Sequence, residues 1–101
     1  MIEKIYEIKT DSHKFTLNID SLVIAKSTIK AILTKPIVIP FENIDNITMD
    51  ESDSIYTELK ITTKDKNEHK FELKPDKTDE VKSLREQSRI IYLYIKFVIK
   101  K

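Results

Sequence analysis

The chain contains no cysteine, no glycine and no tryptophan, and it has three prolines in 101 residues. Without cysteine it forms no disulfide, offers no thiolate nucleophile and builds no cysteine-ligated zinc site. Without glycine it has neither a P-loop nor the dinucleotide-binding fingerprint, because both need glycine where the backbone approaches phosphate. These absences exclude several large classes of enzyme and cofactor-binding protein.

The chain also lacks an excess of charge of either sign, since its formal net charge is +1. A nearly neutral chain gives no electrostatic reason to expect DNA or RNA as a partner. The charges are unevenly placed, however. Residues 36–59 carry six acids and no base, whereas residues 60–101 carry twelve bases and seven acids. These segments either meet within one fold or meet a neighbouring copy.

Long apolar runs are absent too. The first ten residues mix acids with bases, so no signal peptide is expected. The longest apolar stretch, residues 90–99, is about half of what a membrane-spanning helix needs. A cytoplasmic protein is therefore the default expectation. Hydrophobic residues make up 40% of the chain, and no linker or repeat interrupts it. We expect one domain over residues 1–101 with one core.

Strands are predicted over most of residues 2–74. Residues 14–20 alternate polar and apolar side chains, which is the period of a half-buried strand. Further strands are expected at residues 22–25, around Ile29, Ala31 and Leu33, and at residues 37–41. The last of these lies between Pro36 and Pro40, which places it at a sheet edge or strand end. The spacing of Ile44, Ile47 and Met49 breaks period two and indicates a bulge.

The best hairpin signal lies at residues 55–74. Ile55, Thr57, Leu59 and Ile61 share one face, and so do His69, Phe71 and Leu73. Aspartate and asparagine at residues 64–67 replace the missing glycines in the turn, because they bond their own backbone. Similar turn chemistry occurs at residues 10–12 and 50–53. Antiparallel pairing is expected to bring Glu58 and Lys60 near Glu72 and Lys70, with opposite charges close on the outer face.

The hydrophobic period then changes to that of a helix, predicted over residues 76–97. Val81, Leu84, Ile91, Ile95 and Val98 recur at steps of three and four, with Ser88 filling the gap. Residues 90–99 also alternate well as a strand. We favour the helix because it continues the phase set by Val81 and Leu84. Leu84 and Ile91 on this helix should face the apolar side chains that point inward from the strands. These are Phe15, Leu17, Ile19, Leu59, Ile61, Phe71 and Leu73.

Strands followed by one C-terminal amphipathic helix resemble a pleckstrin-homology-like (PH-like) domain. Residues 15–24, FTLNIDSLVI, look like two early strands of bacterial PH-like domains. Residues 39–47, IPFENIDNI, resemble the isoleucine-proline-aromatic-acid stretch that enters a central strand of the family. Residues 59–63 and 70–73 look like the next two strands. The resemblance covers about residues 13–97 and implies an antiparallel β-barrel of about seven strands capped by one long helix.

The PH-like resemblance implies a binding scaffold, since such folds bind lipid headgroups, peptides or proteins, and bacterial members often self-assemble. Fold alone does not choose among these. The phosphoinositide-binding members use a basic early hairpin that ends in an arginine. Here Lys9 and Lys14 stand for the first two bases, but Thr16 occupies the place of the arginine. Binding to anionic membranes should therefore be weak and nonspecific.

Three groups of residues are candidates for contact with a partner. The acidic patch consists of Asp45, Asp50, Glu51 and Asp53, and the basic stripe consists of Lys82, Arg85 and Arg89, with Tyr92 and Lys96 continuing it. Apolar residues in the second half of the helix spread beyond the stripe that one docking face requires: Ile90, Tyr92, Leu93, Tyr94, Phe97 and Val98. The third group consists of four of them, Ile90, Tyr94, Phe97 and Val98. A helix with apolar residues on every side needs a second surface to bury them, so a homo-oligomer is expected.

Catalysis and cofactors are not expected. His13 and His69 are the only histidines, the calcium-loop spacing is absent, and the serines lack a nucleophile elbow. Two main function classes remain. The first is a non-catalytic binding or self-assembly module of PH-like fold, and the second is a small inhibitor, such as an immunity or anti-defence protein, that binds one partner. A weak membrane-surface binder is a third possibility.

Overall fold

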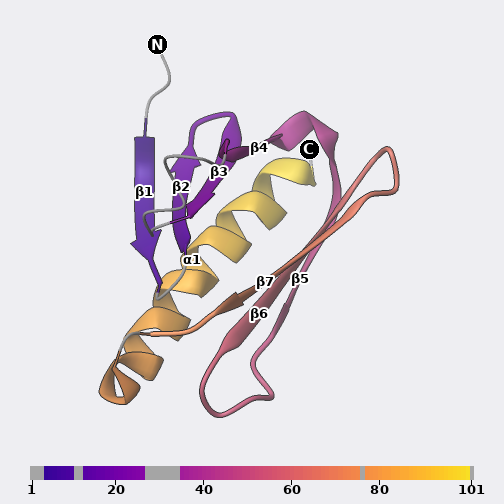
Figure 1. Ribbon diagram of the computed structural model, residues 1–101. Helices are drawn as coiled ribbons and strands as arrows, with labels where there is room; N and C mark the ends of the chain where they lie inside the picture. Colours follow the sequence, from indigo (N-terminus) through magenta and orange to yellow (C-terminus); the bar gives the residue numbers. More distant parts are fainter. Residues whose placement is uncertain (1–3, 11–12, 27–34, 76, 101) are drawn as a thin grey trace.

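The computed structural model describes residues 4–10, 13–26, 35–75 and 77–100, and it has an α+β architecture. Its strands are β1 (Lys4–Lys9), β2 (His13–Asn18), β3 (Ser21–Lys26), β4 (Ile37–Pro40), β5 (Ile44–Asp50), β6 (Thr57–Thr63) and β7 (Glu68–Leu73). The helices are the 3₁₀ turns η2 (Phe41–Asn43) and η3 (Thr78–Glu80) and the α-helix α1 (Val81–Ile99). Figure 1 shows their order along the chain.

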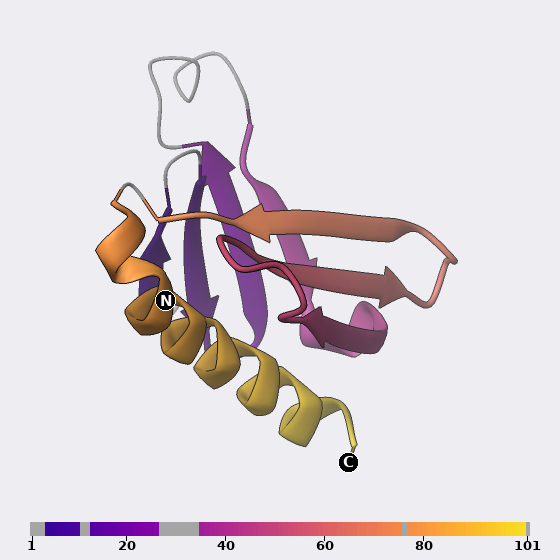
Figure 2. The same cartoon turned by 90° about the horizontal axis from the view of Figure 1, so that it is seen from below.

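The strands form two antiparallel sheets. One sheet has the order β1-β2-β3-β4, and the other has the order β5-β6-β7. The strands of the two sheets cross in direction, and α1 runs diagonally along one side of both (Figures 1 and 2). Helix α1 contacts the edge strands β1 and β5 as well as η2 and β6. It therefore covers the opening between β1 and β5, and one hydrophobic cluster joins both sheets to the helix.

The expected closed barrel is not found, because within the described residues no backbone ladder joins the two sheets. Between β1 and β5, helix α1 packs across the opening where a closed barrel would have paired strands. At the other opening β4 is a short edge strand with a proline at its end, and η2 redirects the chain before β5 begins. Proline limits the ladder that such an edge can extend. The strand expected around Ile29, Ala31 and Leu33 lies outside the described residues.

In β6 the observed burial follows the period-two pattern of the sequence. Thr57, Leu59, Ile61 and Thr63 are buried, and the residues between them are partly exposed. The predicted core residues on β2, β6 and β7 are buried, as are Leu84 and Ile91 on the helix. The two aromatic side chains of this set, Phe15 and Phe71, meet edge to face with ring centroids 5.5 Å apart. These predictions from hydrophobic periodicity are confirmed.

Ile19 was wrongly predicted to face the core, since it is 57% exposed. The alternation continues through residue 20, but β2 ends at Asn18 and residues 19 and 20 form the turn to β3. Asn18 is buried in its place and its amide donates to the Ser21 hydroxyl at 3.4 Å. Ile55 leaves the predicted face for the same reason, because it precedes β6 and is half exposed.

The edge and bulge predictions are confirmed. β4 pairs with β3 and ends its sheet. The Phe41 amide donates to the Asp20 carbonyl at 2.9 Å. Because hydrogen-bonding positions alternate along an antiparallel strand, the nitrogen of Pro40 faces away from β3. The absence of an N–H on Pro40 therefore removes no hydrogen bond between β3 and β4. The β5–β6 register shifts between Ile44 and Asn46, where the period breaks in the sequence.

The β6–β7 hairpin brings the four predicted charged residues together, but the opposite charges lie on the diagonals and not directly across. Glu58 lies opposite Glu72, and Lys60 lies opposite Lys70, so like charges face each other directly. The opposite charges are diagonal neighbours, two residues along the ladder on the same face. The turn sets this register. Lys66 adopts a positive φ of 70°, and Asp65 accepts hydrogen bonds from Thr63 and from the Asn67 side chain, the latter at 2.9 Å.

Residues 90–99 are helical, as favoured over the strand alternative, because α1 runs from Val81 to Ile99. The helix begins later than predicted, since η3 occupies Thr78–Glu80 first. Its buried face is Leu84, Ser88, Ile91 and Ile95. Ser88 fills the gap in the stripe as predicted. It is fully buried and donates to the Leu84 carbonyl at 2.8 Å.

Candidate interaction surfaces

The C-terminal half of α1 carries an exposed apolar stripe. Ile90, Leu93 and Phe97 are 47%, 61% and 63% exposed. They are spaced three and four residues apart, so they share one helix face. The buried face of the same helix lies on the opposite side. A helix that buries one apolar face in its own core and exposes a second one is unusual for a monomer of this size.

Tyr94 and Val98, two of the predicted self-association residues, lie beside the core instead of on this stripe. Both are partly buried and pack against the core cluster. The Tyr94 ring lies 6.0 Å from that of Phe41, centroid to centroid. Leu93 was not among the candidates, although it is one of the most exposed apolar side chains. The exposed stripe is therefore Ile90, Leu93 and Phe97.

Arg85 belongs to the predicted basic stripe, but its guanidinium is used inside the chain. Its Nη2 donates to the carbonyls of Asp53 and Tyr56, the second at 3.1 Å, and its Nε donates to the Thr57 hydroxyl at 3.1 Å. The side chain is only 20% exposed. Arg85 thus connects the loop between β5 and β6 to the first turns of α1. Its guanidinium is therefore not available to bind a partner.

Arg89 pairs with Glu51, so the acidic and basic segments meet within one fold. Its Nε donates to one carboxylate oxygen of Glu51 at 2.8 Å, and its Nη2 donates to the other. Arg85 approaches the same carboxylate at 3.9 Å. Lys82 is exposed and lines a hollow of about 400 Å³ together with both arginines. Further along, the Lys96 ammonium lies 5.8 Å from the Tyr92 ring centroid.

The other members of the acidic patch do not pair with an arginine as Glu51 does. Asp50 and Asp53 act within their own loop. Asp50 accepts from the Ser52 amide at 2.8 Å, and Asp53 accepts from the amides of Ile55 and Tyr56 at 2.8 and 3.2 Å. Asp45 is exposed at the opposite end of β5. The turn chemistry predicted at residues 50–53 is confirmed.

These contacts give the protein a defined response to acid. The hydrogen bond from Arg89, helped by the charges of Arg89 and Arg85, lowers the pKa of the Glu51 carboxyl. Hydrogen bonds from their own loops lower the pKa values of Asp50, Asp53 and Asp65. A lowered folded-state pKa adds stability above the group's ordinary pKa and removes it as the pH falls through the lowered value.

Glu51→Gln should therefore lower the unfolding midpoint in urea at neutral pH and flatten its decline in acid. The parent should lose the Glu51 contribution as the pH falls from the ordinary glutamate pKa of 4.5 through the lowered value. Urea unfolding at a series of pH values measures both effects. Glu42→Gln, at an exposed glutamate in η2, is the control for losing one carboxylate. Equal midpoint profiles for the two variants would contradict this role of Glu51.

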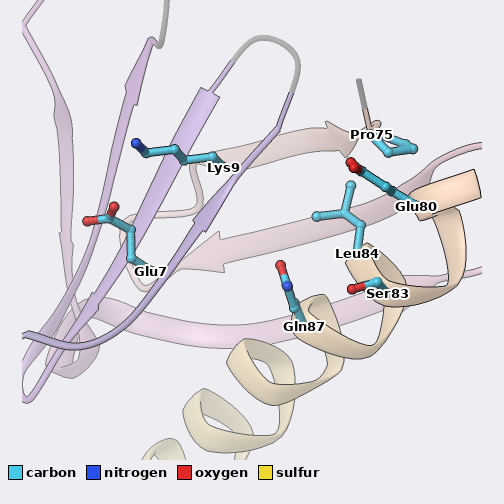
Figure 3. A pocket seen from close by; sticks show the side chains of 7 residues that line it. All are labelled: Glu7, Lys9, Pro75, Glu80, Ser83, Leu84 and Gln87. Atoms are coloured by element: carbon cyan, nitrogen blue, oxygen red, sulfur yellow. The ribbon is translucent and has the colours of Figure 1, made fainter. Parts of the chain in front are cut away.

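A groove beside the hairpin that carries Lys9 and Lys14 lies between β1 and the start of α1. It has a volume of about 430 Å³ and is lined by Glu7, Lys9, Pro75, Glu80, Ser83, Leu84 and Gln87 (Figure 3). Lys9 lies opposite Lys14 in the β1–β2 ladder, but Thr16 lies opposite the acidic Glu7. The groove therefore mixes both signs of charge and has no arginine to clamp a phosphate.

The histidines lie in an aromatic cluster. His13 and His69 flank Phe71 with ring centroids 6.2 and 6.3 Å from it. The part of the chain that the structure describes contains no group of three or more His, Asp or Glu side chains placed to hold a metal ion. The geometry of the histidines is that of side chains packed at the rim of the core.

None of the helices in the described residues is long and apolar enough to cross a membrane. Comparison of the chain with protein-family models, curated proteins and solved structures finds no match. The geometry of the surfaces described above is therefore the basis for a functional proposal.

Proposed function

We propose that this chain is a non-catalytic self-association module of PH-like fold. The observation that carries the proposal is the exposed stripe Ile90, Leu93 and Phe97 on the outer face of α1. The two crossed antiparallel sheets with a C-terminal helix across their opening are compatible with a PH-like arrangement. Folds of this kind are scaffolds whose function depends on the surface they present.

The stripe favours a protein partner over a membrane. Ile90 and Leu93 are aliphatic and lie one helical turn apart, as in contacts between packed helices. A helix lying on a membrane needs a strongly basic polar face. Here Arg89 binds Glu51 and Lys96 lies against Tyr92, so the exposed charges that flank the stripe are one base, Lys100, and one acid, Glu86.

The inhibitor alternative has less support. It was motivated by the acidic segment at residues 36–59, but Glu51 is paired with Arg89, and Asp50 and Asp53 hold their own loop. The pairing of Glu51 reduces the negative charge that this segment offers to a basic target. Asp45 alone is not a patch.

Leu93→Glu is expected to abolish self-association while leaving the monomer folded. A carboxylate in the middle of the stripe would have to be desolvated in any helix-to-helix contact. The stripe is small, so we expect parent dimers with a dissociation constant of roughly 1–100 µM. Sedimentation velocity over a wide concentration range measures the association of parent and variant. Circular dichroism and thermal unfolding check that both are folded.

Gln87→Glu is the matched control, because it adds the same charge to the same helix at a partly exposed position that lines the groove beside β1, off the repeat of the stripe. It should associate like the parent. A parent that stays monomeric up to about 1 mM would overturn the proposal. So would a folded Leu93→Glu variant with unchanged association. Co-sedimentation of the parent with neutral and with anionic vesicles tests the membrane alternative, for which we expect no binding at physiological salt.

A further inference from the structure

The apolar stripe continues into a charged residue at each end. The outer face of α1 presents Glu86, Ile90, Leu93, Phe97 and Lys100 at steps of four, three, four and three, and all five side chains are exposed. Lys100 follows the last helical residue in right-handed helical conformation, with φ −72° and ψ −13°, so it keeps the helical phase. Steps of three and four are the repeat of a seam between two nearly aligned helices.

The charges at the two ends have opposite sign and are equally far from the centre. Glu86 lies seven residues before Leu93, and Lys100 lies seven residues after it. At the standard rise this is about 10.5 Å on each side. A second copy of the helix laid antiparallel with Leu93 at the centre brings each glutamate to a lysine. A parallel copy would bring glutamate to glutamate and lysine to lysine.

Two other charges near the stripe, Arg89 and Lys96, do not oppose this orientation. Arg89 lies one turn from Glu86, and its guanidinium is held by Glu51. Lys96 lies to the side, over the Tyr92 ring. Antiparallel helices also align their dipoles favourably. The net charge of +1 per chain gives two copies little overall repulsion.

We propose that two copies pair α1 against α1 in antiparallel orientation about a two-fold axis at Leu93. Glu86 of each chain then lies beside Lys100 of the partner subunit, and Ile90 and Phe97 flank the axis. A two-fold contact of this kind uses the same surface on both chains and closes on itself, so it makes dimers and not filaments. The inference rests on the proposed self-association and specifies its geometry.

Reversal of the end charges tests the orientation. Glu86→Lys alone and Lys100→Glu alone each put like charges together twice per dimer. Each should weaken the dissociation constant roughly three- to tenfold, since exposed pairs contribute little individually. The double variant Glu86→Lys/Lys100→Glu restores both pairs and should return to the parent value. In a parallel dimer each position would meet its own copy, so neither single variant would change the dissociation constant. Sedimentation equilibrium at low salt measures all four proteins.

Cross-linking provides a second measurement, because the natural chain contains no cysteine. Glu86→Cys and Lys100→Cys proteins, one carrying a mass tag, are mixed and treated with a short bis-maleimide. The expected product joins position 86 to position 100. Cross-links between two Glu86→Cys chains would overturn the antiparallel geometry while leaving self-association intact. A parent without any association would overturn both, so the two failures are distinguishable.

Discussion

Ile91→Ala should lower the free energy of unfolding by about 2–5 kcal/mol. Ile91 is fully buried on the inner face of α1, within the cluster that joins the helix to both sheets. Truncating it removes apolar surface from the core and leaves a cavity, because close-packed neighbours relax only in part. For a domain of this size the loss is a large fraction of the total stability.

Ile90 is the matched control, since it is the preceding residue, has the same side chain and is 47% exposed. Ile90→Ala should cost less than about 1 kcal/mol, because an exposed side chain leaves no cavity. Urea unfolding at a concentration below that of dimer formation measures both variants, and the slope with urea should stay constant. Equal losses for the two variants would contradict the assignment of the inner and outer helix faces.

This pair of residues also shows how far the sequence alone reaches. The inner face of α1 follows from residues that recur with the helical period and continue the phase of Val81 and Leu84. The alternation of β6 is equally local, and both were predicted correctly. Ile19 was not, because the polar-apolar alternation runs on through a turn, and a two-residue turn leaves no mark in that pattern.

Contacts between segments that are far apart in the chain could not be predicted from the sequence. Neither the two-sheet arrangement nor the β6–β7 register follows from local periodicity, because the turn at Lys66 decides which charges lie opposite one another. Tyr94 was expected outside the core, but its burial depends on Phe41, half the chain away. By contrast, Leu93 follows from the sequence, because it lies outside the docking stripe and on the helical repeat that runs along the outer face from Glu86 to Lys100.

The two arginines of α1 were equivalent in the sequence and are not equivalent in the structure. Arg85 is 20% exposed and donates to two carbonyls and a hydroxyl of the β5–β6 loop, whereas Arg89 is 53% exposed and donates to one carboxylate. Backbone carbonyls of a loop have no alternative partner unless water replaces the guanidinium. The structural role of Arg85 should therefore exceed that of Arg89.

Arg85→Ala is expected to lower the free energy of unfolding by about 2–3 kcal/mol, because hydrogen bonds from a charged donor are among the stronger ones and their loss leaves acceptors unpaired. Arg85→Lys should recover little of this, since one ammonium cannot reproduce the planar fork that reaches Asp53, Tyr56 and Thr57. Arg89→Ala removes the same charge from the same helix and should cost clearly less. Urea unfolding ranks the three variants, and hydrogen exchange of the Ile55 and Tyr56 amides reports on the loop directly. Faster exchange in Arg85→Ala than in Arg89→Ala is expected, whereas equal exchange and equal stability would mean that Arg85 is only a surface cation.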